Sequence, residues 1–309
     1  MNLLITGAWN GGKNYISEIE SMGHQIRFMQ YETDVLSCDE NWVEGVICNG
    51  LFLSHPIEKF TNLKYIQLTS AGFDRVDMDF VKAHNIEIHN ARGVYSIPMA
   101  EFAVCGVLQL YKQSAFFREN QRSRLWKKHR DLLELNGKQV LIVGCGSVGN
   151  ECAKRFLPFG CRLTGVDLFP REDTLYQKIL PLEQLDSALK SADIIVLTVP
   201  LTKQTRHLID ESKLSLIKDG ATLVNIARGA IVDTEALIRH IDRLGGAVLD
   251  VFEEEPLDEA STLWGKKNAI LTPHNSFVGE GNGERLREIM IGNLEKNRRR
   301  VWHISRLMK

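Results

Sequence analysis

The stretch that decides the fold runs from Gln139 to Asp167 and begins Gln-Val-Leu-Ile-Val-Gly-Cys-Gly-Ser-Val-Gly. Its apolar run, Val140 to Val143, is typical of a buried parallel strand, and it enters the pattern Gly-x-Gly-x-x-Gly at residues 144–149. Apolar side chains at helical spacing follow, and a second apolar run ends at Asp167. This order of strand, glycine turn, helix and strand, closed by an acid, predicts a dinucleotide-binding fold.

Each glycine of the turn has a physical reason. Gly144 allows the tight turn, Gly146 lets a pyrophosphate approach the backbone, and Gly149 lets the helix pack closely on the strand. The helix N-terminus then offers unpaired N–H groups to the phosphates. Asp167 can accept both ribose hydroxyls and would repel a 2′-phosphate, which favours NAD over NADP, although Arg171 nearby can accommodate that phosphate. A glycine-rich turn without a ligand is the alternative.

Composition indicates an ordinary globular protein. The chain has 309 residues, of which 44% are hydrophobic and 25% are charged, and its net charge is −1. This length suggests two domains, and the near-neutral charge gives no reason to expect a nucleic acid or a membrane as partner. The six cysteines include no C-x-x-C pair, which argues against a disulfide framework or a zinc site and for a reducing compartment.

The amino-terminal segment, Met1 to Gly7, has the pattern of a strand and not of a signal peptide, because it lacks a basic start and a long apolar core. No apolar run is long enough to span a bilayer. Together with the cysteine pattern, this leads us to expect a cytoplasmic protein.

Short strands and helices alternate along the chain, which predicts an α/β fold with two doubly wound parallel sheets. We expect a flavodoxin-like substrate domain from residues 1–95 plus 284–309, and a Rossmann domain for NAD from residues 96–283. A helix over residues 97–122 is expected to cross from one domain to the other. The loop at residues 7–12 lacks the Gly-x-Gly-x-x-Gly order, and we interpret it as a turn.

Polar or charged residues follow four predicted strands of the second domain, at the edge where open α/β sheets bind ligands. Three of them, Arg228, Glu255 and His274, have complementary chemistry. An Arg can clamp a carboxylate bidentately, a His can exchange a proton near neutral pH, and a Glu can hold the tautomer of that His. Any one alone is equally explained as a surface residue. Together with NAD they suit hydride transfer to a 2-oxo carboxylate.

With these motifs in order from Leu63 to His274, the chain resembles the D-isomer-specific 2-hydroxyacid dehydrogenase family. The matching stretches are Thr69–Asp77, Asn90–Glu101, Gly144–Gly149, Val199–Thr205, Asn225–Gly229, Leu249–Leu257 and Thr272–His274. The resemblance implies NAD(H)-dependent interconversion of a small 2-oxo acid and its D-2-hydroxy acid, with substrates the size of glyoxylate or hydroxypyruvate. It also implies a homodimer. The resemblance extends to phosphoglycerate dehydrogenases, among which this chain would be expected to be a form without the regulatory domain.

The resemblance also implies residue roles. Arg228 would bind the substrate carboxylate and polarise the carbonyl, and Glu255 would pair with His274, which would donate or remove the proton. The other substrate-binding candidates are Ser70, Ala71 and Gly72, whose N–H groups would form a nest for the carboxylate, with Arg92 and Tyr95.

The cofactor candidates lie on the glycine turn and at strand ends of the second domain. They are Gly144, Gly146, Ser147, Val148, Gly149, Asp167, Val199, Pro200, Thr205, Ile226, Ala227 and Asp250. Asp250 would face the carboxamide of the nicotinamide and so select the ring face that is presented.

Three features leave alternatives open. Arg92 stands where many family members have Pro, and either engages a second polar group of the substrate or pairs with a neighbouring carboxylate. The loop Asn275–Gly281 departs from the family pattern, so its contacts to substrate stay open. The basic run Arg118–Arg130, with Trp126 inside it, is interpreted as a solvated or subunit-facing surface and not as a nucleic-acid site.

Two other functions share this architecture. A non-catalytic NAD-sensing binding protein, as in corepressors that resemble the family, would not need the Arg, Glu and His set. A formate dehydrogenase needs no acid–base step, and Glu255 beside His274 disfavours it. We therefore expect an NAD-dependent oxidoreductase without a metal ion, whose physiological 2-hydroxy acid the sequence does not specify.

Overall fold

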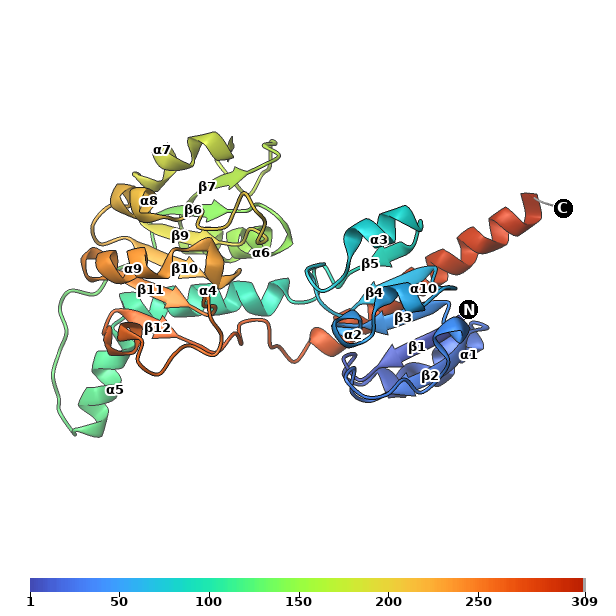
Figure 1. The fold of residues 1–309 in the computed structure, drawn as a ribbon. Helices are drawn as coiled ribbons and strands as arrows, with labels where there is room; N and C mark the ends of the chain where they lie inside the picture. The colour runs from blue at the N-terminus through green and yellow to red at the C-terminus, as the bar shows by residue number, and fades with distance from the viewer. Residues whose placement is uncertain (308–309) are drawn as a thin grey trace. The chain divides into compact units, whose positions relative to one another are not determined.

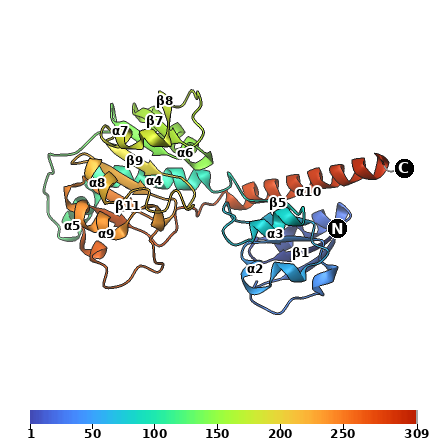
Figure 2. The same ribbon diagram turned by 45° about the horizontal axis from the view of Figure 1, so that its top comes forward.

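The structure, a computed structural model, describes residues 1–307 and the side chains of residues 1–297. The chain divides into two compact units. Unit 1 comprises Met1–Tyr95 and Gly279–Lys309, and unit 2 comprises Ser96–Val278. Each unit has its own sheet with helices on both faces (Figures 1 and 2), and every pairing between the described strands is parallel. The predicted fold class is confirmed.

Unit 1 has the strand order β2-β1-β3-β4-β5 within the described residues. Its strands are β1 (Asn2–Thr6), β2 (Gln25–Met29), β3 (Gly45–Cys48), β4 (Tyr65–Leu68) and β5 (Glu87–His89), and its helices are α1 (Ile16–Ser21), α2 (Leu51–Ser54), α3 (Met78–Ala83) and α10 (Asn282–Leu307). Leu3 and Ile5 of β1 pack on one face of the sheet, together with Leu286, Met290 and Leu294 of α10. The helix that ends the chain therefore completes the core that the first strand begins.

Unit 2 has the strand order β12-β11-β10-β9-β6-β7-β8 within the described residues. Its strands are β6 (Gln139–Val143), β7 (Arg162–Asp167), β8 (Lys178–Pro181), β9 (Ile194–Leu197), β10 (Thr222–Asn225), β11 (Gly246–Leu249) and β12 (Ala269–Leu271). Its helices are α4 (Ser96–Tyr111), α5 (Ser114–Arg122), α6 (Ser147–Phe156), α7 (Leu185–Leu189), α8 (Glu211–Leu216) and α9 (Thr234–His240).

Residues of β6 alternate between two hydrophobic clusters. Val140 and Ile142 pack with α4 and α6, and Leu141 and Val143 pack with α7, α8 and α9. Burial on both faces explains why this strand is a continuous apolar run. The chain leaves β6 toward β7 and returns on its other side at β9, so the order reverses at the carboxyl end of β6. Open α/β sheets bind ligands at such a switch point.

The helix predicted over residues 97–122 is wrong as a single element. Gln113 takes a left-handed backbone (φ 52°) between α4 and α5, which interrupts the hydrogen-bond ladder. We expected this segment to cross from one domain to the other. Both of its helices belong to unit 2 instead. Strand β8 was not predicted, because it is short, starts at an exposed Lys178 and ends at Pro181. The last two residues of the predicted carboxyl-terminal helix lie outside the described residues.

In the part of the chain that the structure describes, no helix combines the length and the apolar character needed to cross a membrane.

Candidate active site

The glycine turn joins β6 to α6 at the switch point of unit 2. Gly144 has a positive φ of 100°, and a Cβ on it would lie 2.8 Å from Val199 N. A Cβ on Gly149 would lie 2.0 Å from Gly144 O, so only glycine lets α6 approach the strand. Gly146 faces open space, with no heavy atom within 4 Å of a Cβ, and no side chain caps the N-terminus of α6. The turn is thus a cradle open to a ligand, and its N–H groups suit a pyrophosphate.

Asp167 and Arg171 both contact the glycine turn at Cys145. The Asp167 carboxylate accepts hydrogen bonds from Cys145 N at 2.7 Å and from Phe169 N at 2.9 Å. Arg171 Nη2 donates to Cys145 O at 2.6 Å and lies 3.6 Å from Asp173. Burial raises the pKa of the Cys145 thiol to about 12, so this side chain stays neutral beneath the turn.

The remaining cofactor candidates build the neighbouring strand ends of the same edge. Thr205 is buried, donates to Pro200 O at 2.6 Å and accepts from Thr202 N at 2.7 Å, which folds the loop after β9 into a compact turn. Ile226 and Ala227 are buried directly after β10. Their backbone, and not their side chains, is what a ligand at this edge would meet.

Arg228 follows β10 and is half-buried. Its backbone oxygen accepts a hydrogen bond from Asn225 Nδ2 at 3.0 Å, which fixes the loop. Its Nη1 donates to Ala227 O at 2.7 Å, and among the described residues this is the hydrogen bond that the guanidinium makes. Nε and Nη2 are left to bind a carboxylate.

The structure brings His274 and Glu255 together. His274 Nδ1 lies 2.8 Å from Glu255 Oε2, and Phe252 N donates to Glu255 Oε1 at 3.0 Å. The carboxylate is therefore anchored on one oxygen and holds the imidazole with the other. Because Nδ1 is engaged, Nε2 is the ring nitrogen left for proton exchange.

The carboxylate of Asp250 is engaged within the protein. Asp250 is fully buried, and its carboxylate accepts hydrogen bonds from Thr272 Oγ1 at 2.6 Å, Asn275 N at 2.8 Å and Ser276 N at 2.9 Å. The backbone N–H of His274 also donates to Asp250 O at 2.7 Å. Asp250 therefore holds the segment that carries His274, which has a left-handed backbone (φ 49°).

His207 and Glu253 form a second pair that we did not identify from the sequence. His207 Nε2 contacts Glu253 Oε1, and both residues lie on loops after strands of the same edge. β9 ends at Leu197, well before His207, so the rule that selected Arg228 and His274, position just beyond a strand, does not select His207.

In unit 1, Ser70, Ala71 and Gly72 form a loop after β4. Asn90 Nδ2 donates to Ala71 O at 2.6 Å, and Ala91 N donates to Ser70 O at 2.8 Å, so the carbonyl groups are engaged. Among the described residues, the three N–H groups of this loop donate to no protein acceptor. Such neighbouring free N–H groups suit a small anion.

Tyr95 and Arg92 lie close to this loop in the sequence. Tyr95 OH donates to Thr69 O at 2.5 Å, and burial raises the pKa of its phenol. Arg92 is exposed, and no carboxylate in the described part of the chain lies within ion-pair distance of its guanidinium. The alternative that Arg92 pairs with a neighbouring acid therefore finds no support.

The residues of unit 2 fit a dinucleotide. Gly146 leaves the turn open, the first N–H groups of α6 have no side-chain cap, and Asp167 ends the next strand. No group of three or more His, Cys, Asp or Glu side chains within the described residues is arranged to hold a metal ion.

A model of the family "D-isomer specific 2-hydroxyacid dehydrogenase, NAD binding domain" matches residues 104–276, more than half of the chain. The (S)-sulfolactate dehydrogenase of Chromohalobacter salexigens is 34% identical over 244 residues, which are 78% of this chain and 79% of that protein. The chain belongs to the D-isomer-specific 2-hydroxyacid dehydrogenase family. It is an NAD-dependent oxidoreductase, as the sequence predicted.

Other members of this family resemble this chain over most of its length. The glyoxylate/hydroxypyruvate reductase A of Arabidopsis thaliana is 33% identical over 290 residues, 90% of each chain. A solved family member from Aeromonas salmonicida superposes with a TM-score of 0.81 at 30% identity, covering 94% of this chain and 93% of that one. The D-lactate dehydrogenase of Aquifex aeolicus, solved with NAD and lactic acid, has a TM-score of 0.77 at 28% identity over 95% and 94%. A family member from Xanthobacter autotrophicus, solved with NADPH, superposes with a TM-score of 0.74 at 25% identity, covering 94% of this chain and 95% of that one.

Proposed function

We propose that this dehydrogenase interconverts a small 2-oxo acid and its D-2-hydroxy acid by hydride transfer with NAD(H). The observation that carries the proposal is the contact of 2.8 Å between His274 Nδ1 and Glu255 Oε2 at the ligand-binding edge of unit 2. It leaves Nε2 free for the proton that the carbonyl oxygen gains on reduction.

In the proposed mechanism, Nε and Nη2 of Arg228 bind the substrate carboxylate and polarise the adjacent carbonyl. His274 donates its Nε2 proton to the carbonyl oxygen during reduction and accepts the hydroxyl proton during oxidation. Glu255 keeps the ring oriented and balances the charge of the protonated imidazole. When bound, NADH supplies the hydride, and the glycine turn with the strand-end residues described above would hold it.

NAD is proposed in preference to NADP. Two N–H groups hold the Asp167 carboxylate at the end of β7, where its negative charge would repel a 2′-phosphate. Arg171, the residue that weakens this preference, donates to Cys145 O. An assay with NADH and NADPH in parallel tests the preference, and equal kcat/KM for the two would contradict it.

The proposed substrates are of the size of glyoxylate and hydroxypyruvate, which several relatives are named for. The free N–H groups of residues 70–72 suit a small anion and are proposed as substrate-binding groups. Arg92, exposed and without a carboxylate partner among the described residues, would engage a second polar group of the substrate, and Tyr95 would border it.

A panel of 2-oxo acids assayed with NADH is the direct test. Oxidation of NADH that depends on glyoxylate or hydroxypyruvate is expected. Binding of NADH without turnover of any 2-oxo acid would instead indicate an NAD-sensing binding protein. Oxidation of formate as the main activity would indicate a formate dehydrogenase.

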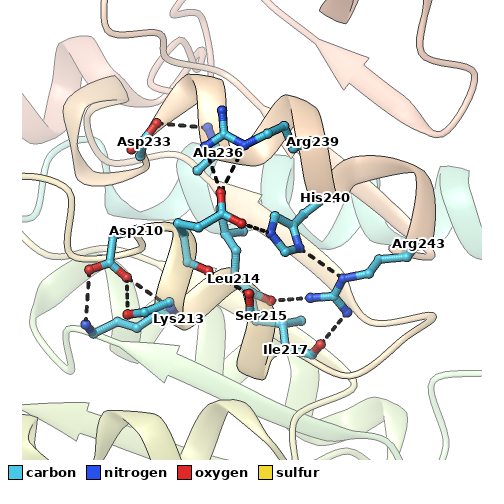
Figure 3. Close-up of polar contacts among 12 residues, drawn as sticks. Asp210, Lys213, Leu214, Ser215, Ile217, Asp233, Ala236, Arg239, His240 and Arg243 are labelled. Carbon is cyan, nitrogen blue, oxygen red and sulfur yellow. Dashed lines mark hydrogen bonds and ion pairs between the residues drawn. The ribbon is translucent and has the colours of Figure 1, made fainter.

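Replacement of Arg228 by Ala tests the carboxylate clamp. We expect kcat/KM for the best 2-oxo acid to fall by more than about 100-fold, or roughly 2.7 kcal/mol, because the substrate loses its charge partner. The control is Arg239→Ala: Arg239 is an exposed arginine of unit 2 that binds Glu211 at 2.7 Å (Figure 3). A loss below about tenfold, roughly 1.4 kcal/mol, would show that Arg228 is not the clamp.

A homodimer in the cytoplasm is proposed as the working form. In Figure 1, α5 and the loop after it stand out from the body of unit 2, and Trp126 on this loop is 99% exposed. A second copy would cover the exposed Trp126 and Leu125, which lie within the basic run of residues 118–130. All six cysteines, which lie in the described part of the chain, are free thiols, as suits a reducing compartment.

A further inference from the structure

The pair His207–Glu253 lies against the loops that carry Arg228 and Glu255, two of the three proposed catalytic residues. Its side-chain contact joins His207 Nε2 to Glu253 Oε1. Glu253 stands two residues before Glu255, on the same loop after β11. The His207 side chain is therefore attached to the loop that holds the imidazole of His274.

The backbone of His207 is attached to the other loop. Its N–H donates to Ala230 O at 2.8 Å, and Ala230 stands two residues after Arg228. Two residues further along, Ile209 and Val232 form a parallel β-bridge, so the contact extends over several residues. His207 thus connects the loop of Arg228 to the loop of Glu255.

These two loops also pack directly on each other. A Cβ on Gly229 would lie 1.8 Å from Phe252 C and 2.4 Å from Glu253 N, so the backbones touch without room for a side chain. Phe252 N in turn donates to Glu255 Oε1. A shift of the loop after β11 would therefore move the anchored carboxylate relative to Arg228.

The conformation of His207 indicates that these contacts act on its backbone. Its φ is 49°, in the left-handed region that L-residues adopt with difficulty, and His274 shares this value. A residue stays in this region only when its surroundings hold it there. For His207, the hydrogen bond from its backbone N–H to Ala230 O fixes the main chain, and the contact with Glu253 fixes the side chain.

We propose that His207 is a positioning residue: it sets the spacing between Arg228 and the Glu255–His274 pair through Ala230 and Glu253. This inference rests on the proposed function, since it places that function's catalytic residues. His207 would act without touching substrate. Displacement of a reacting group by about 1 Å costs on the order of 100-fold in rate, so a loosened loop has a measurable effect.

The test compares three variants of the full-length protein. His207→Ala removes the contact, and His207→Gln keeps a donor near the position of Nε2. His240→Ala is the matched control, because His240 also pairs with a glutamate, Glu211 at 2.5 Å, but on the helices α8 and α9 (Figure 3). We expect His207→Ala to lower kcat/KM by about 10- to 100-fold, His207→Gln to restore most of it, and His240→Ala to change it by less than about twofold.

A double-mutant cycle separates positioning from a general loss of stability. If His207 acts through Glu253, the double variant with Glu253→Ala loses no more than either single variant. The proposal would be overturned if the losses of kcat/KM from His207→Ala and Glu253→Ala multiplied in the double variant. It would also be overturned if His207→Gln were as slow as His207→Ala, or if His207→Ala were no slower than His240→Ala.

A structural measurement keeps the inference independent of the proposed function. Crystal structures of the His207→Ala and His240→Ala variants compare the distance from the guanidinium of Arg228 to the carboxylate of Glu255, which is in contact with His274. Lengthening of this distance in His207→Ala alone would support positioning even if the wild-type protein turned over no 2-oxo acid, an outcome that would reject only the proposed function. An unchanged distance from Arg228 to Glu255 in His207→Ala would overturn the inference.

Discussion

Gly149 is the residue of the glycine turn that tolerates the least change. A Cβ there would lie 2.0 Å from Gly144 O, a backbone atom that cannot rotate away. We predict that Gly149→Ala lowers the free energy of unfolding by about 2 kcal/mol, because α6 must move off the strand. The affinity for NADH should fall by about tenfold or more, since the turn opens. Urea unfolding and a fluorescence titration measure the two effects.

Gly292→Ala is the control for this variant. Gly292 lies in α10, and a Cβ on it would meet no heavy atom within 4 Å outside the backbone of its own helix. Alanine here should leave NADH binding unchanged and raise stability by up to about 1 kcal/mol through its helix propensity. If both alanine variants behave alike, steric contact with Gly144 is not the reason for the glycine at position 149.

At the level of single residues, Asp250 shows where prediction from sequence ends. Its place after β11 was predictable, because an apolar run leads directly into it. Its hydrogen bonds to Thr272, Asn275 and Ser276 were not, because they depend on how the loop after β12 folds back. The role of His207 was not predictable for the same reason, because its partner Glu253 lies 46 positions away on another loop.

At the level of elements, Asp193 joins parts of unit 2 that are distant in sequence. It precedes β9 and accepts hydrogen bonds from Gln139 N of β6 at 2.7 Å and pairs with Lys218 Nζ at 2.7 Å. Burial works to raise the pKa of this carboxyl, but the hydrogen bonds from Lys218 and Gln139 outweigh it and lower the pKa. We predict that Asp193→Asn destabilises the protein by about 1 kcal/mol at pH 7.

The pH dependence of this effect has a definite sign. Because the folded-state pKa of Asp193 lies below the unfolded value, its contribution is complete above about pH 4 and disappears as the pH falls through the folded-state pKa. Urea unfolding of both proteins between about pH 7 and about pH 3 should show the two curves converging. Asp219→Asn, at an aspartate whose side chain is 83% exposed, should cost little at any pH. A difference that stays constant over this range would contradict the assignment.

Prediction succeeded best for elements whose pattern follows from burial on both faces. β6, β9 and β10 were predicted within two residues of their ends, since each is a continuous apolar run. The break at Gln113 was not predictable, because glutamine in a helical pattern gives no sign of a left-handed backbone. Strand β8 lies at the edge of the sheet, begins at Lys178 and ends at Pro181. Because only two apolar residues lie between these ends, its sequence shows no strand pattern.

For the whole molecule, the exposed surface of α5 and its loop leads to a prediction about assembly. Trp126 is 99% exposed and Leu125 58%, an unusual exposure for such side chains in a monomer. We predict that Trp126→Asp shifts a dimer to monomers, since removal of an aromatic anchor from each copy costs about 2 kcal/mol or more. Light scattering with size-exclusion chromatography measures it. Val35→Asp, at a position of unit 1 that is 93% exposed, should leave the dimer intact. A monomeric wild-type protein would refute the prediction.

The way α10 completes unit 1 has a consequence for the synthesis of the protein. Leu3 and Ile5 are synthesised before every residue of unit 2, whereas Leu286, Met290 and Leu294, which pack with them, are synthesised after every residue of unit 2. Unit 2, whose residues are contiguous, can bury its core during translation. The apolar face of β1 therefore lacks these partners until α10 has been synthesised, and chaperones can bind it during that time.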